Sequence, residues 1–107
     1  MQFDIDINSK HKELFLGARK LLFTYELVET KKERITTYSD KHGGVCHMRT
    51  MKHGIDIAFL KGVRMEDEFG LLTGSGKVMR VLPLTSINKT QIEYSINQAI
   101  KINSLKK

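Results

Sequence analysis

Two alternating segments joined by a short loop constrain the fold of this chain most. The segments VCHMRT and IDIAFLK flank the loop MKHG. Antiparallel pairing can oppose Cys46 to Phe59, Met48 to Ile57 and Thr50 to Ile55 on one face, and Arg49 to Asp56 and His47 to Ala58 on the other. A shift by one residue would set Met48 against Asp56 and would mix the two faces. We therefore predict a hairpin in this register, with a four-residue loop from Met51 to Gly54.

A helix is expected before this hairpin. Apolar residues recur there at spacings of three and four, which is typical of one helical face; they are Leu14, Ala18, Leu21, Leu22 and Tyr25, widened by Phe15 and Phe23. Ser9 or Asn8 is the predicted N-cap, and the helix should end near Phe23 to Tyr25. Gly17 within it costs about 1 kcal/mol relative to alanine, which indicates either a close packing contact or a tolerated weak position.

The C-terminal segment carries the clearest helix signals. Asn88 followed by Gln91 matches a capping box, and Ile87 and Ile92 occupy the positions of a hydrophobic staple. An apolar face then continues to about Asn103, so we predict a second helix there.

The remaining segments complete an α+β pattern. RITTY is rich in β-branched and aromatic residues and predicts a strand, Met65 to Leu72 predicts one or two helical turns, and KVMRVLPL predicts a further strand. Pro83 lacks a backbone donor, so that strand should end there or lie at an edge. We predict a single domain over residues 1–107, a two-layer α+β sandwich. It has an antiparallel sheet of about four to five strands, with the N- and C-terminal helices on one face.

Charge and cysteine content narrow the range of partners and cellular compartments expected for this chain. Lysine and arginine number 18 against 12 acidic residues, a net charge of +6. Such a balance favours anionic partners, although lysines spread along the whole chain also fit an ordinary solvated surface. The single cysteine, Cys46, cannot form an internal disulfide. No leader pattern and no membrane-length apolar run occurs, so we expect a cytoplasmic protein.

The stretch TGSGK, Thr73 to Lys77, resembles a phosphate-binding loop only superficially. A P-loop requires a glycine where Leu71 stands and a hydroxyl residue where Val78 stands, and it leads into a helix rather than a strand. A dinucleotide fingerprint would need a third glycine at Met79. The stretch is therefore either a tight glycine turn or a concavity of backbone N–H groups that binds an anion with Lys77 and Arg80.

Metal and catalytic sites have weak support. Cys46 and His47 are neighbours on a predicted strand and should point to opposite faces, while His42 and His53 fall in turns at its two ends. No arrangement of ligands, nucleophile or paired carboxylates has the spacing that zinc binding or acid–base catalysis requires. We predict no metal site, no cofactor and no enzymatic activity.

Nucleic-acid binding is a minor alternative. The charge suits it, and His47 and Arg49 on the face opposite the apolar one can contact a phosphate. However, no predicted strand carries the paired exposed aromatic residues on which bases stack.

Several short motifs resemble the YdhG-like family of small bacterial cytosolic domains, most of unknown function. The motifs are Val45 to Met48, then Phe59 with Lys61 and Gly62, then Gly70 to Leu72, Gly74 to Lys77, and Met79 with Arg80. The similarity as a whole extends from the first helix to about Ile102. One departure lies in the first strand, where Thr36 stands at a position that is often proline in the family. The resemblance implies an α+β sandwich.

The resemblance also implies an alternative function, because some relatives are likened to frataxin and proposed as iron chaperones. Such a role requires an exposed acidic surface of oxygen ligands. Only Glu66 to Glu68 cluster here.

The leading hypothesis is a non-enzymatic domain that binds an anionic small molecule or a protein partner, as a monomer or a homodimer. Backbone N–H groups of a glycine turn and nearby cations would hold the anion. The candidate site residues are Lys61, Gly74, Ser75, Gly76, Lys77 and Arg80.

Overall fold

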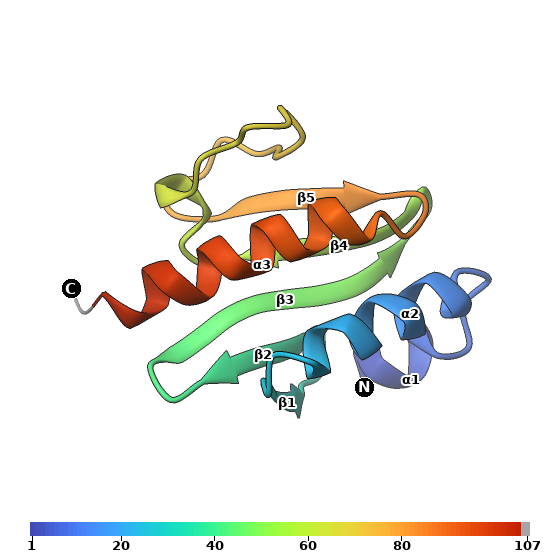
Figure 1. Cartoon of the computed structure of the whole chain (residues 1–107). Helices are drawn as coiled ribbons and strands as arrows, with labels where there is room; N and C mark the ends of the chain where they lie inside the picture. The colour runs from blue at the N-terminus through green and yellow to red at the C-terminus, as the bar shows by residue number, and fades with distance from the viewer. Residues whose placement is uncertain (106–107) are drawn as a thin grey trace.

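The structure, a computed structural model, describes residues 1–105 of the chain. Its elements are α1 (Gln2–Asp6), α2 (Lys12–Phe23), β1 (Val28–Lys31), β2 (Thr36–Asp40), β3 (Gly43–Met51), β4 (Gly54–Phe59), the 3₁₀ turn η1 (Gly62–Arg64), β5 (Arg80–Leu84) and α3 (Lys89–Ser104). The five strands form one antiparallel sheet in chain order, and Figure 1 shows α2 and α3 on the same side of it. The predicted α+β sandwich is confirmed. No helix within residues 1–105 is long and apolar enough to cross a membrane.

The predicted register of the central hairpin is confirmed. Cys46 pairs with Phe59, Met48 with Ile57 and Arg49 with Asp56. The strands extend further than predicted, because Met51 and Gly54 also pair, so the connecting loop is only Lys52 and His53. Gly54 has a positive φ of 150°, and a Cβ there would lie 2.1 Å from the carbonyl oxygen of Leu84. The tight turn therefore depends on the absence of a side chain at Gly54.

A bulge explains why two consecutive residues of β3 are both buried. Tyr38 pairs with Cys46 and Ser39 with Gly44, which leaves Val45 as an extra residue on β3. An extra residue disrupts strict alternation. Consequently Val45 joins Cys46 in the core, and from His47 onward the strand alternates regularly between the two faces.

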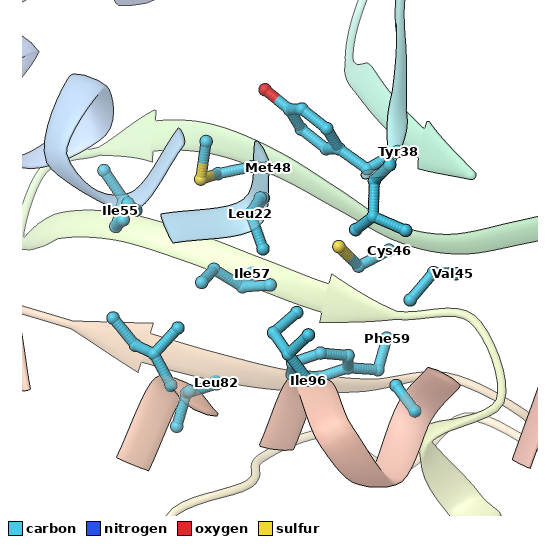
Figure 2. Close-up of a cluster of buried hydrophobic side chains, with 14 of the residues drawn as sticks. Leu22, Tyr38, Val45, Cys46, Met48, Ile55, Ile57, Phe59, Leu82 and Ile96 are labelled. Carbon is cyan, nitrogen blue, oxygen red and sulfur yellow. The ribbon is translucent and has the colours of Figure 1, made fainter. Parts of the chain in front are cut away.

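The core lies between the sheet and the helices. Figure 2 shows Leu22 of α2 and Ile96 of α3 among the side chains of β3, β4 and β5. The buried faces of the two longer helices are Phe15, Ala18 and Leu22 on α2, and Ile92, Ser95, Ile96, Ala99 and Asn103 on α3. Both predicted helical faces thus supply the core. The predicted cap of α3 is also confirmed, because the Asn88 side chain accepts a hydrogen bond from the Gln91 amide.

The predicted N-terminal cap is wrong, because the chain forms two helices there. Ser9 Oγ accepts a hydrogen bond from the His11 amide, which is a local turn of the kind that competes with a helix. Asn8 donates to the Asp4 carbonyl at the end of α1. The helix α2 therefore begins only at Lys12, without a side-chain cap.

A buried carboxylate anchors the short helix α1 to the sheet. Asp6 is fully buried, and its Oδ1 accepts hydrogen bonds from the Thr50 amide, the Thr50 hydroxyl and the Gln2 side chain, at 2.8 to 2.9 Å. The second oxygen, Oδ2, has no hydrogen-bond partner within the described chain. A five-residue helix has little stability of its own, so this contact and the burial of Phe3 fix its position.

An ion pair joins α2 to the edge of the sheet. The Arg19 guanidinium donates two hydrogen bonds, of 2.6 and 2.9 Å, to the Glu29 carboxylate, which also accepts one from the Tyr38 hydroxyl. Arg19 lies against the rings of Phe3 and Phe23 as well. The Arg19 and Tyr38 hydrogen bonds lower the pKa of Glu29, although partial burial opposes them. This two-pronged geometry is the strong form of an arginine–carboxylate pair.

Four further segments differ from the predictions, and KVMRVLPL is one of them, because β5 begins only at Arg80. The polar strand β1 was not expected, and the predicted strand at RITTY begins later, at Thr36. The helical turns predicted from Met65 to Leu72 are wrong: helical structure is confined to η1, and the Asp67 carboxylate instead accepts hydrogen bonds from the amides of Leu71 and Leu72. The side chain of Asp67 thus replaces the helical pattern of backbone bonds.

Two glycine substitutions should have opposite effects on stability. Gly54→Ala should lower the free energy of unfolding by more than about 2 kcal/mol, because the new Cβ meets backbone and the positive φ is strained. Gly17→Ala should raise it by about 0.5–1 kcal/mol, since its Cβ would make an ordinary 3.4 Å contact with Ile87 within a helix. Urea denaturation of both variants measures this, and equal effects would contradict the described turn.

The Glu29 ion pair should contribute to stability above acidic pH. The folded pKa of Glu29 is lowered, so its contribution is complete above the unfolded value of about 4.3 and is lost as pH falls from there through the lowered folded pKa. Thermal unfolding between pH 3 and 6 should show a shallower acid loss for Glu29→Gln than for the wild type. Glu13→Gln, an exposed acid on α2, is the matched control and should retain the wild-type slope.

Candidate functional site

The helices leave one face of the sheet uncovered, and this helix-free face carries the candidate site. The register places Thr37, His47, Ala58 and Val81 in one row across β2 to β5. Arg49, Asp56 and Pro83 form the next row on the same face. The hairpin register thus assigns His47 and Arg49 to this face, as the sequence predicts, while Cys46 lies in the core.

A shallow hollow of about 270 Å³ lies on the helix-free face. Its apolar walls are Ile35 before β2, Ala58 on β4, Met79 before β5 and Val81 on β5. Its polar side chains are His47, Arg49 and Asp56. Ala58 stands between His47 and Val81 in the row, and its small side chain leaves room there.

Arg49 is the principal charge of the hollow. It is exposed, and no hydrogen bond or ion pair connects its guanidinium to another residue within 1–105. Asp56 lies opposite Arg49 in the register, but the Asp56 Oδ1 instead pairs with His53 Nε2 at 2.9 Å. The predicted opposite-charge neighbours therefore share a row without forming an ion pair, and the arginine donors remain available to a ligand.

His47 contributes a neutral polar group. Partial burial and the positive charge of Lys32 lower the pKa of His47 below its ordinary value. At neutral pH the imidazole is therefore uncharged, with one nitrogen donating and the other accepting. Its cross-strand neighbour Thr37 has a buried hydroxyl without a hydrogen-bond partner among the described residues.

The glycine turn stands beside this hollow. Thr73 and Val81 exchange two backbone hydrogen bonds, of 2.8 and 2.9 Å, which close the turn at its base. Figure 1 shows the segment between η1 and β5 projecting beyond the edge of the sheet. Gly74 has a φ of 115°, as a glycine turn requires. No helix follows the turn, since the chain continues into β5, which agrees with the rejection of a P-loop.

The predicted site residues are brought together only in part. Arg80 Nη1 donates to the carbonyl oxygens of Gly76 and Met79, at 2.6 and 2.7 Å, so this guanidinium holds the turn closed. Ser75 and Lys77 are exposed. Lys61 lines a narrow crevice with Ala99 and Asn103 of α3. The next residue, Gly62, lies against the Arg80 backbone, which a Cβ there would approach to 2.5 Å.

A second, larger groove of about 610 Å³ lies where α2 and α3 end. Tyr25, Val28 and Ile100 line it, together with side chains of both charges. Among these, the Asp40 carboxylate already accepts hydrogen bonds from the His42 amide and the Asn103 side chain. The mixture of charges does not select one class of ligand.

Cys46 has no reactive character. It is fully buried, and burial raises the pKa of its thiol to about 12. A thiolate is the nucleophile and metal ligand, so the Cys46 thiol stays protonated and inert at neutral pH. Within residues 1–105, no group of three or more histidine, cysteine, aspartate or glutamate side chains is placed to hold a metal ion.

Sequence reasoning found part of the hollow and missed the rest. The hairpin register identified His47, Arg49, Asp56 and Ala58 as neighbours on one face. Ile35 and Met79 fall within the predicted strands RITTY and KVMRVLPL, but they were missed because the sequence did not show how those strands pair with the hairpin. Val81 could have been found from the alternation of β5, since it shares a face with Pro83.

Comparisons with protein-family models, with curated proteins and with solved structures find no match to this chain. Among the described residues that line its hollow, the helix-free face offers one unpaired guanidinium, one neutral imidazole and an apolar wall, which suit the binding of an anion.

The contacts of Arg80 predict how firmly the glycine turn is held. Arg80→Met keeps the length of the side chain but removes both bonds to the turn carbonyls. Native-state trypsin cleavage after Lys77 should become about tenfold faster, since losing about 1.4 kcal/mol of local stability raises the open population by that factor. Cleavage after Lys41, in the β2–β3 turn, is the internal reference. An unchanged ratio of the two rates would show that Arg80 does not hold the turn.

Proposed function

We propose that this chain is a non-enzymatic binding domain that holds an anionic small molecule on the helix-free face of its sheet. The observation that carries the proposal is the unpaired guanidinium of Arg49 at the rim of the hollow. An arginine donates to a carboxylate or phosphate through a planar fork, which fixes orientation as well as charge. His47 stands beside it in the same hollow and supplies a further donor.

The glycine turn contributes to this site through Lys77. Met79 lines the hollow, and Lys77 precedes it by two residues, which places the two backbones within about 7 Å of each other at 3.3 Å per residue. The long Lys77 side chain supplies a second, mobile positive charge. Gly74, Ser75 and Gly76 form the turn, and Arg80 holds it through two hydrogen bonds. Lys61 lies in the separate crevice beside α3 and adds only to the general positive field.

The overall charge supports the same proposal. With a net charge of +6, the chain attracts anions from solution, which raises their local concentration near a cationic site. This electrostatic attraction acts on any anion, whereas the Arg49 guanidinium would hold one anion in a defined position. The charge and the hollow together favour an anionic small molecule over iron or a nucleic acid.

A binding screen with charge-removing variants tests the proposal. Thermal shift and calorimetry would use inorganic phosphate, sulfate and simple organic acids, with ferrous iron and a single-stranded oligonucleotide representing the iron and nucleic-acid alternatives. For any anion that binds, Arg49→Gln should weaken affinity about tenfold to a hundredfold, because hydrogen bonds to charged groups contribute about 1.5–3 kcal/mol.

Two further variants locate the site. Lys77→Ala should weaken binding only a few-fold, as expected for an exposed charge at the rim. Lys101→Gln removes a charge from the exposed side of α3 and should have no effect. An anion that binds equally well to the wild type and to Arg49→Gln would place the site elsewhere.

A further inference from the structure

The hollow on the helix-free face also indicates which kind of anion it takes. We infer that its ligand is a small monocarboxylate with an apolar body, such as a short-chain or aromatic acid, rather than a phosphate. This inference rests on the proposed function and deepens it. The size of the hollow, its charge and the chemistry of its walls all favour such a ligand.

Size limits the ligand first. The volume of the hollow, which is open to solvent on one side, is about 270 Å³. It lies just below the range of about 300–1,000 Å³ typical of sites for drug-sized ligands. A ligand of on the order of ten non-hydrogen atoms fits this space, which excludes nucleotides and extended cofactors from full enclosure.

Charge selects a single negative group. Arg49 is the one cation among the residues that line the hollow, and Asp56 stands opposite it with a half-buried carboxylate. His47 is neutral at pH 7 because burial and Lys32 oppose its protonation. Lys77 and Lys32 lie outside the lining of the hollow, so within it Asp56 repels each negative charge of a ligand. A phosphate monoester with two charges is repelled more than a monocarboxylate, which therefore suits the hollow better.

The walls select an apolar body. Ile35, Ala58, Met79 and Val81 present aliphatic or thioether surface around the single guanidinium. An acetate ion would leave this surface in contact with water, while a longer acyl chain or a ring would cover it. Burial of apolar surface contributes favourably in proportion to the area removed from water, so affinity should increase with the apolar part of the acid.

A matched series of six-carbon ligands tests this ligand class by calorimetry at pH 7 and low salt. The series is hexanoate, hexanol, hexylamine and hexyl phosphate, with acetate and inorganic phosphate as headgroup controls. Hexanoate should bind at least tenfold more tightly than acetate, hexanol or hexylamine, and more tightly than either phosphate. Arg49→Gln should abolish the difference between hexanoate and hexanol.

One substitution tests the location without altering charge. Ala58→Ile should fill the centre of the hollow, and it lies on the uncovered face, where a β-branched residue suits a strand. Hexanoate affinity should fall at least tenfold while the unfolding midpoint stays near that of the wild type. Ala58→Val is a milder second variant if the isoleucine disturbs folding. Unchanged hexanoate binding to a folded Ala58 variant would overturn the location.

The outcomes separate the ligand class from the general function. If a phosphate binds more tightly than hexanoate and depends on Arg49, the ligand class is wrong and the anion-binding function stands. If acetate binds as tightly as hexanoate, the apolar contribution is absent and the class is again wrong. If no anion of the series binds the wild-type protein, the inference and the proposed function both fail.

Discussion

The pairing of β3 with β4 determines how the rest of the molecule is divided. Its register sends Cys46, Met48, Ile55, Ile57 and Phe59 to one face and the polar His47, Arg49 and Asp56 to the other. The helices α2 and α3 cover the apolar face, because only there can they bury their own apolar residues. The uncovered face then retains the polar residues and the hollow. Core and candidate site are thus two consequences of one register.

Much of the fold could be predicted from local chemistry. The hairpin was predictable because a shift by one residue would have exchanged every side chain between faces, and α3 because its cap and its apolar period agree. The predictions failed where side chains replaced backbone bonds. Ser9 interrupts the N-terminal helix, and Asp67 prevents a helix after η1, each through hydrogen bonds that the residue type allows but does not require.

The candidate site was only partly predictable, for a related reason. Strand alternation separates the two faces within one strand, but it does not show which face of β2 or β5 joins which face of the hairpin. Ile35 and Met79 were therefore not recognised as walls. The sequence suggested that Arg80 binds an anion. In the structure its guanidinium donates hydrogen bonds to carbonyl oxygens of its own turn. A basic side chain next to a glycine turn can stabilise that turn as readily as a ligand.

The two edge strands of the sheet, β1 and β5, differ from its uncovered face in how they can interact with other molecules. In β5, the amide and the carbonyl of Val81 both form hydrogen bonds with Thr73. The backbone of Pro83, two residues further, faces the same outer edge but has no amide hydrogen to donate. The opposite edge strand, β1, is only four residues long and carries the charged residues Glu29 and Lys31. Edge strands that are short, charged or contain proline discourage the lateral addition of strands from other chains. The sheet therefore resists growing sideways into fibres, and the face that the helices leave bare is the part of the sheet that stays open to other molecules.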